Sequence, residues 1–207
     1  LHVLYNGVDT TLFHPVLKEK YRQPIRHTLG IPDDAAILLF VGSGFERKGL
    51  ATLLRAIAHT QQSCYLLVVG YDKHRHRYQE LARQLKIAQW VRFLGPQFDV
   101  TPYYGAADAL TMPPLYEPFG NVFLEAMASG LPILTSDTAG AAELVQEGIN
   151  GHVCDALDVA GIAEVIRSFQ SISYCSQLGI RARETAEQFT LERYVEALEV
   201  LYQQWLD

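Results

Sequence analysis

The 207-residue chain has few of the residues that mark disulfide-rich, metal-binding or membrane-spanning proteins. Its three cysteines, Cys64, Cys154 and Cys175, are odd in number and widely spaced, with no CxxC pair. Neither a disulfide framework nor a zinc knuckle is therefore expected. No apolar run reaches membrane-spanning length, and no signal peptide is visible. We expect reduced thiols and a cytoplasmic location.

Positive charge is also scarce, because 17 Lys and Arg face 23 Asp and Glu, for a formal net charge of −6. A general nucleic-acid surface depends on many cationic contacts to phosphates, and this composition argues against one. A single nucleotide needs only one or two such contacts. The one basic run, residues 72–77, reads mainly as a solvated loop and helix start and only weakly as part of a nucleotide cleft. Its two histidines lack the further ligands that a metal would need.

Continuous apolar runs alternate with segments of helical spacing, which predicts an α/β protein. The expected architecture is a Rossmann-like, three-layer α/β/α domain with a parallel sheet of about six strands. Predicted strands cover 36–41, 65–69, 90–94, 109–112, 131–135 and 151–154. Predicted helices cover 22–29, 50–59, a stretch around 81–85, 99–107, 158–169, 173–188 and 191–206; the rest of residues 1–35 is expected to be irregular.

Residues 116–132 form the stretch around which the chain is organised, and they read as a loop, a helix and a stop. Helix entry near Gly120 and Asn121 would leave free backbone N–H groups that suit an anion. Glu125, about a turn further on, has the acceptor atoms for two ribose hydroxyls, and Glu117 on the loop would reach a second hydroxylated ring. The plain alternative is a buried helix with two solvated glutamates.

Three loops should converge at the carboxyl ends of the parallel strands, where ligands of open α/β sheets bind: 42–49, 95–98 and 117–122. In the first, Arg47 and Lys48 follow a glycine-rich turn, so a diphosphate would meet both fixed amides and cations. A dinucleotide fingerprint fails because Arg47 occupies the third glycine position. A Walker loop fails because no glycine precedes Lys48 and no Ser or Thr follows it.

Residues 117–120 and 124–133 resemble the E-x7-E signature of retaining glycosyltransferases of family 4, which have the two Rossmann-like domains of the GT-B fold. Residues 6–15, 40–50 and 140–151 resemble further blocks of that family in the same order. The loop at 42–49 is most similar to that of lipopolysaccharide-core glucosyltransferases. It has Ser43 where the family usually has arginine, and Arg47 would supply that charge. Pro114 stands where serine is common.

The resemblance implies that this chain is the C-terminal, donor-binding half of such an enzyme. Residues 1–35 would lead in from a preceding N-terminal domain, 36–189 would bind the nucleotide sugar, and the helix in 190–207 would pack back on that first domain. The donor would be a UDP-sugar, with UDP-glucose favoured, and no metal or other cofactor is implied. The base would lie near 94–97. The implied catalytic residues are Glu117, Lys48 and Arg47; the implied donor-binding residues are Gly42, Ser43, Gly44, Leu94, Gly95, Phe119, Gly120, Asn121, Val122 and Glu125.

In the family the acceptor site and a further catalytic group belong to the first domain. The chain begins at Leu1 without an initiator methionine, so we expect a fragment that binds donor and transfers nothing by itself. The whole protein would be a hexosyltransferase acting on a glycan, lipopolysaccharide-core or lipid acceptor, with peripheral membrane contact through its first domain. An epimerase-like protein or a non-catalytic nucleotide-binding module of the same fold remains an alternative.

Overall fold

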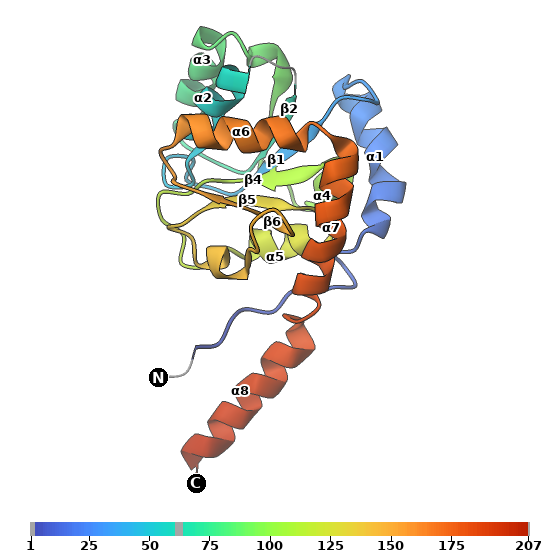
Figure 1. The fold of residues 1–207 in the computed structure, drawn as a ribbon, viewed down its shortest axis with the longest axis vertical. Helices are drawn as coiled ribbons and strands as arrows, with labels where there is room; N and C mark the ends of the chain where they lie inside the picture. The colour runs from blue at the N-terminus through green and yellow to red at the C-terminus, as the bar shows by residue number, and fades with distance from the viewer. Residues whose placement is uncertain (1–2, 61–63, 207) are drawn as a thin grey trace.

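In the computed structural model, which describes residues 3–60 and 64–206, six parallel strands form one sheet in the order β3-β2-β1-β4-β5-β6 (Figure 1). The chain starts in the middle of the sheet, builds outward to one edge, and returns to build the other half. The predicted fold class is confirmed. The strands are β1 (Ile37–Val41), β2 (Tyr65–Val69), β3 (Val91–Gly95), β4 (Ala109–Thr111), β5 (Ile133–Ser136) and β6 (Gly151–Cys154).

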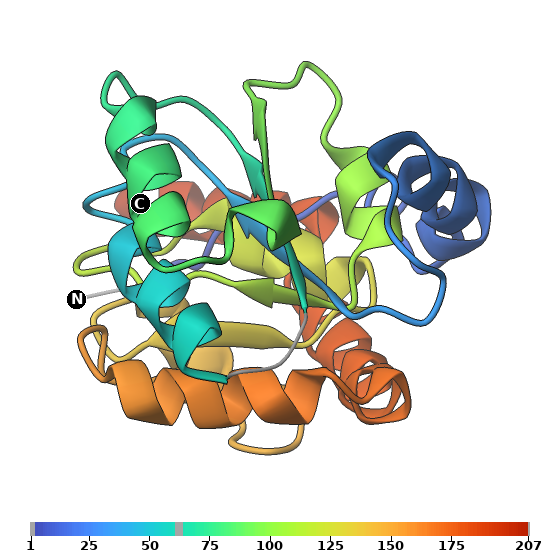
Figure 2. The same ribbon diagram turned by 90° about the horizontal axis from the view of Figure 1, so that it is seen from above.

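Helices cover both faces of the sheet, as the right-handed connection of parallel strands requires. One group packs α2 against α3 and α6; the other pairs α1 with α4 and α5 with α7 (Figure 2). The helices are α1 (Val16–Leu29), α2 (Leu50–Thr60), α3 (Arg75–Gln84), α4 (Thr101–Ala106), α5 (Asn121–Ala128), α6 (Val159–Phe169), α7 (Ile172–Ala186) and α8 (Leu191–Leu206). Two short 3-10 turns, η1 (Ala88–Trp90) and η2 (Gly140–Leu144), complete the order.

Strand β1 is buried along its whole length because helices cover both of its faces. It pairs in register with β2 on one side and β4 on the other, and its apolar side chains join the single hydrophobic core. A strand in this position needs the continuous apolar run that the sequence has there. The central strands therefore form a rigid base for the loops that follow them.

Helix α1 begins at Val16, earlier than the predicted start at residue 22. The prolines misled the prediction: Pro15 lies at the N-cap, where a missing N–H costs nothing, and Pro24 is accommodated inside the helix. Smaller corrections concern β3, which starts after η1, and β5, which starts at Ile133 rather than 131. The last helix spans 191–206 as predicted.

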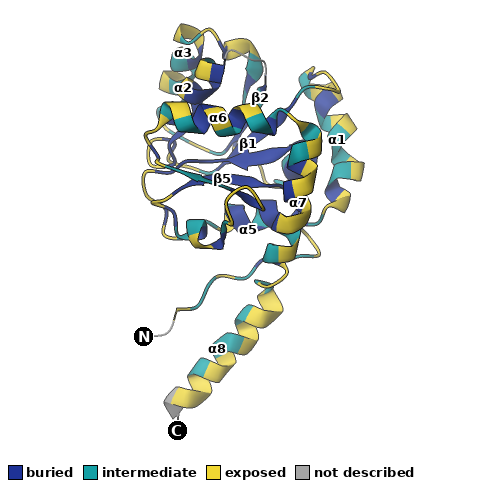
Figure 3. Ribbon diagram, viewed as in Figure 1, coloured by how far each residue is buried: buried dark blue, intermediate teal, exposed yellow. Residues whose placement is uncertain are grey.

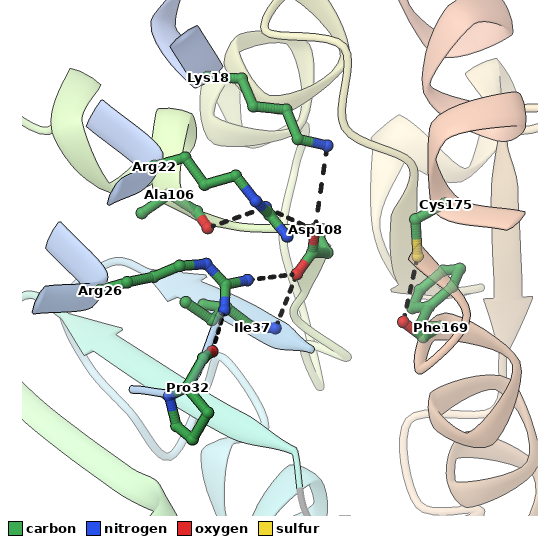
Figure 4. Close-up of polar contacts among 9 residues, drawn as sticks. All are labelled: Lys18, Arg22, Arg26, Pro32, Ile37, Ala106, Asp108, Phe169 and Cys175. Carbon is green, nitrogen blue, oxygen red and sulfur yellow. Dashed lines mark hydrogen bonds and ion pairs between the residues drawn. The ribbon is translucent and has the colours of Figure 1, made fainter. Parts of the chain in front are cut away.

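A buried ion cluster fixes α1 to the amino ends of two central strands (Figure 4). Asp108 lies immediately before β4. One of its oxygens, Oδ2, accepts hydrogen bonds from the Ile37 amide at 2.9 Å and the Arg26 guanidinium at 3.3 Å. The other, Oδ1, accepts from Arg22 at 2.8 Å, and Lys18 lies 4.0 Å away. The side chains of Asp108 and Arg26 are fully buried, so this cluster is part of the core.

Helix α8 extends away from the body of the domain, and most of its described surface is exposed (Figure 3). Its first turn is held to the N-terminal segment: the Val8 amide donates to the Phe189 carbonyl at 2.8 Å, and the Leu191 amide donates to the Val8 carbonyl at 3.2 Å. The N-terminal segment and α8 thus leave the domain at the same place. Within the described residues, no helix has the length and apolar character to cross a bilayer.

Candidate functional site

The glycine-rich loop after β1 lies against the loop after β4, and glycines make this contact possible. A Cβ on Gly49 would lie 1.8 Å from the Pro113 carbonyl oxygen, and one on Gly42 would lie 2.4 Å from the Lys48 side chain. Gly44 has a φ of 75°, which only glycine adopts without strain. The Leu115 amide donates to the Arg47 carbonyl at 2.8 Å and joins the two loops. The glycines of the first loop therefore allow Lys48 to lie close to the loop that carries Glu117.

Glu117, Lys48 and Arg47 form one ionic cluster. Glu117 Oε2 accepts from Lys48 Nζ at 2.8 Å and from Arg47 Nη1 at 3.0 Å, and Arg47 also donates to the Tyr116 carbonyl at 2.8 Å. The side chains of Lys48 and Glu117 are only 9% and 11% exposed, whereas that of Arg47 is 46% exposed. Burial raises the pKa of Glu117, but the hydrogen bonds and charges of Lys48 and Arg47 outweigh it and hold the pKa below its ordinary value. Two cations surround one carboxylate, which leaves one positive charge for an incoming anion.

The N-terminus of α5 adjoins this cluster. Gly120, with a φ of 82°, takes the N-cap position of α5, and a Cβ on it would lie 3.0 Å from Glu117 Cγ. Among the described residues, the amides of Gly120, Asn121 and Val122 donate to no backbone or side-chain acceptor. Free amides at a helix start attract anions. A phosphate between α5 and Lys48 would satisfy both.

Glu125 lies on α5 and is held by a tyrosine that sequence reasoning did not assign to the site. Tyr104 on α4 donates its hydroxyl to Glu125 Oε2 at 2.7 Å. Burial raises the pKa of Glu125 above its ordinary value, and the Tyr104 hydrogen bond opposes that effect. The described residues place no cation against Glu125, so its other oxygen is available to hydroxyl donors. Tyr104 was visible in the sequence only as an aromatic residue of a short helix, with no spacing that linked it to Glu125.

Asp72 is a second residue that the sequence did not single out as important. Its Oδ2 accepts from the Phe45 amide and its Oδ1 from the His74 amide, both at 2.7 Å, so it joins the loop after β1 to the loop after β2. Ser43 Oγ accepts from the Tyr71 amide at 3.3 Å and adds to this link. A cavity of about 680 Å³ opens between the two loops; it is lined by Ser43, Gly44, Glu46, Arg47, Tyr71, Asp72, Lys73, His74 and Leu115.

The remaining predicted residues lie at the end of β3, two strands away from β1. Leu94 and Gly95 end that strand, and the Gly70 amide donates to the Gly95 carbonyl at 2.9 Å. Arg75 braces the strand from α3 by donating to the Phe93 carbonyl at 2.7 Å. In the described part of the chain, no hydrogen bond or ion pair joins Leu94 or Gly95 to the Glu117 cluster. Their role toward a base stays a prediction.

Metal binding would require several His, Cys, Asp or Glu side chains to lie close together. Residues 3–60 and 64–206 contain no cluster of three or more His, Cys, Asp or Glu side chains that would hold an ion. The ring centroids of His74 and His76 lie 6.4 Å apart, and among the described residues the two belong to no such cluster. Metal independence stays a prediction, since a donor's own phosphates would add ligands of their own.

The chain was compared with known proteins. The family model described as "Glycosyl transferases group 1" matches residues 22–185. The lipopolysaccharide core biosynthesis glycosyltransferase LpsE of Rhizobium meliloti (strain 1021) is 34% identical over 174 residues, which cover 83% of this chain and 51% of LpsE. Sucrose-phosphate synthase from Thermosynechococcus elongatus matches with a TM-score of 0.87 at 31% identity, over 99% of this chain and 52% of that one. Anabaena Alr3699/HepE in complex with UDP and glucose matches with a TM-score of 0.82 at 25% identity, over 98% and 57%.

The parallel sheet, with its glycine-rich and E-x7-E loops at the carboxyl ends of the strands, is the C-terminal domain of the GT-B fold. The chain belongs to the glycosyl transferases group 1, which is family 4 of the glycosyltransferases. It spans about half the length of the curated relatives it matches. The resemblance stated from the sequence is thereby confirmed at the level of family and fold.

Proposed function

We propose that the cleft binds a UDP-sugar, with UDP-glucose as the donor, and that the whole protein transfers its hexosyl unit with retention to a glycan, lipopolysaccharide-core or lipid acceptor. One observation carries the proposal: the Glu117, Lys48 and Arg47 cluster lies beside the free amides at the start of α5. Cations and fixed amides on one side of a carboxylate suit a diphosphate that carries a hydroxylated ring.

Lys48, Arg47 and the amides of Gly120 and Val122 would stabilise the negative charge that develops on the departing diphosphate. Such preorganised donors act on charge that grows in the transition state. The Lys48 side chain is nearly buried, so its attraction to phosphate is screened less than that of a surface lysine. Arg47, which is more exposed, has room to turn from Glu117 toward a phosphate oxygen.

Two carboxylates would orient the sugars. Glu125, already held by Tyr104, would accept hydrogen bonds from ribose hydroxyls. Glu117, with the backbone of Phe119 and Gly120, would hold hydroxyls of the donor sugar and so fix its anomeric carbon relative to the acceptor. The loop of Gly42, Ser43 and Gly44 would approach the diphosphate, and Leu94 and Gly95 would adjoin the base. No metal or cofactor is part of the proposal.

The choice of UDP and glucose draws on relatives. HepE is described in complex with UDP and glucose, and LpsE is described as acting in lipopolysaccharide core biosynthesis. Those statements concern those proteins, and here they support a donor class and an acceptor class. Transfer would need an N-terminal domain that supplies the acceptor site, so the isolated chain is expected to be inactive. The exposed Leu191, Val195 and Val200 on α8 offer that domain an apolar surface. Its location would be cytoplasmic, with peripheral membrane contact through the first domain.

The test is calorimetric titration of the 207-residue chain with UDP, UDP-glucose, GDP and NAD. Selective binding of UDP and UDP-glucose, weakened in Lys48→Ala and in Glu125→Ala, is the expected result. 2′-Deoxy-UDP separates the two roles, because loss of the ribose 2′-hydroxyl should weaken binding to the unmodified chain and make little difference in Glu125→Ala. Binding of NAD in preference to UDP, or UDP binding that neither substitution changes, would overturn the proposal.

A further inference from the structure

The N-terminal segment, residues 3–15, contacts the loop that leads into α5, residues 117–122, through side chains. We call this loop the donor loop. The N-terminal segment runs past α5 to the start of α8 before it reaches α1 (Figure 1). Asn6 Nδ2 donates to Asn121 Oδ1 at 2.7 Å, and the backbone amide of Asn121 is one of the free donors at the start of α5. The residue that supplies one of these free amides is thus held by a partner 115 positions away in the sequence.

Tyr5 makes a second connection beside the first. Its ring lies 5.8 Å from that of Phe119 on the donor loop and 5.7 Å, edge to face, from that of Phe189 before α8. Its hydroxyl donates to the Glu143 carboxylate in η2. Edge-to-face ring pairs of this kind add a modest stabilisation beyond the area that they bury. Tyr5 therefore links Phe119 to Phe189, which precedes α8.

The segment that carries these two residues has little freedom to shift. Val8 pairs with the backbone on both sides of Thr190. A Cβ on Gly7 would lie 2.7 Å from the Thr190 carbonyl oxygen, so the two backbones approach as closely as glycine permits. Asn6 and Tyr5 directly precede these two backbone contacts. Their contacts with Asn121 and Phe119 therefore fix the donor loop in position relative to the connection between α7 and α8.

We infer that Asn6 and Tyr5 are positioning residues for the donor diphosphate: they fix the Phe119–Val122 turn so that its free amides point at the phosphates. Neither touches the donor; Asn6 acts through Asn121, and Tyr5 acts through Phe119. The inference rests on the proposed function, because it assigns a role within the same site. It predicts a defect in the binding of the diphosphate and the donor sugar and none in the binding of uridine, since the proposed base and ribose contacts lie on β3 and on Glu125.

The experiment compares UDP with uridine by titration calorimetry on the full 207-residue chain. Asn6→Ala should weaken UDP binding about fivefold, the size of one modest hydrogen bond, and leave uridine binding unchanged. Asn121→Ala and the double variant complete a double-mutant cycle: if Asn6 acts through Asn121, the double variant should be no weaker than the weaker single variant. Thr11→Ala, in the same segment, is the matched control and should bind both ligands normally, because the Thr11 hydroxyl donates to Asp9 and not to the loop at α5.

Tyr5 supplies the conservative rescue. Tyr5→Ala should lower UDP affinity selectively, and Tyr5→Phe, which keeps both ring contacts, should restore most of it. The thermal midpoint of each variant shows whether the chain is still folded. Equal losses of UDP and uridine in the Asn6→Ala and Tyr5→Ala variants would reduce both residues to general structural supports and overturn the inference. Additive effects in the cycle would overturn the part of it that concerns Asn6. If the parent chain binds no UDP, the proposed function itself is overturned. The titration of the parent chain alone distinguishes this result from a failure of the inference.

Discussion

Two carboxylates, one at each end of β4, are each surrounded by cations, and the comparison separates stability from function. Asp108, before the strand, contacts Arg22 and Arg26. Glu117, in the loop after it, contacts Arg47 and Lys48. In each cluster two cations lie within 3.3 Å of the carboxylate, and Lys18 lies 4.0 Å from Asp108 as well, but the surroundings of the two carboxylates differ.

At the amino end, the Asp108 oxygens also accept the Ile37 amide, and the Asp108 and Arg26 side chains are fully buried. No oxygen of Asp108 is left for a ligand. At the carboxyl end, Arg47 is nearly half exposed and the α5 amides next to Glu117 have no acceptor. We call the Asp108 group the closed cluster, and it joins α1 to the sheet. The Glu117 group is the open cluster, and its exposed cation and the neighbouring free amides can still bind a ligand. This agrees with the general position of ligand sites at the carboxyl ends of parallel strands.

The largest expected effect comes from opening the closed cluster. Asp108→Ala would leave Arg26 buried without its carboxylate and the Ile37 amide without its acceptor. Removal of one partner from a buried ion pair costs about 3–5 kcal/mol. We expect the free energy of unfolding in urea to fall by that amount, with α1 the first element to lose protection from hydrogen exchange.

Glu80→Ala is the control for this loss, because it removes an exposed carboxylate that pairs with Arg83 across one helical turn. It should leave the urea midpoint almost unchanged. Equal midpoint shifts for Asp108→Ala and Glu80→Ala would mean that the buried cluster contributes no more than a surface pair.

The second effect concerns binding at the open cluster. Lys48→Ala removes a nearly buried cation that should contact the diphosphate, and a charged hydrogen bond of this kind is worth about 1.5–3 kcal/mol. UDP affinity should fall by about 10- to 150-fold, whereas the unfolding midpoint should change little because Arg47 still pairs with Glu117. Calorimetry measures the first quantity and urea unfolding the second. Lys20→Ala, which removes an exposed lysine of α1, should change neither; a matching loss of UDP affinity there would indicate only a general charge effect.

The open cluster could be predicted from the sequence, and the closed cluster could not. Apolar runs and strand order placed Lys48 and Glu117 at the same edge of the sheet, since loops that follow parallel strands share an edge. Asp108 lies between two apolar stretches, and Arg22 and Arg26 lie in the predicted helix 22–29 with no spacing that links them to Asp108. Only the packing of α1 on α4 brings these three together.

The details within the site were also beyond sequence reasoning. The contact between Tyr104 and Glu125, the loop link through Asp72 and the contact between Asn6 and Asn121 all join residues far apart in the chain. Local periodicity carries no information about such pairs. The start of α1 was misplaced for a different reason. Pro15 costs nothing at the N-cap, and Pro24, which is unfavourable inside most helices, is accommodated in this one.

A smaller effect should follow from neutralising the carboxylate of the open cluster. Glu117→Gln keeps a side chain of the same shape but no longer competes with phosphate for Lys48 and Arg47. UDP, which lacks the sugar, should bind about two- to fourfold more tightly, by under about 1 kcal/mol. UDP-glucose should lose its advantage over UDP, because Glu117 is the residue proposed to hold the sugar. Parallel titrations with the two ligands measure this ratio. An unchanged ratio of the two affinities would remove Glu117 from the sugar site.

The smallest expected effect is a pair of opposite pH dependences. Burial raises the pKa of Glu125 in the folded chain, so its contribution to stability is present below the unfolded pKa and is lost as pH rises through the folded value. Lys48 and Arg47 outweigh burial and lower the pKa of Glu117. Its contribution to stability is therefore present above the unfolded pKa and is lost as pH falls through the folded value.

Urea unfolding of the parent, Glu125→Gln and Glu117→Gln chains from about pH 3 to about pH 7 spans both transitions. The stability of the parent relative to Glu125→Gln should decline as pH rises, and that relative to Glu117→Gln should decline as pH falls. Slopes of the same sign would mean that one of the two carboxylates has a different charge environment from the one the contacts describe.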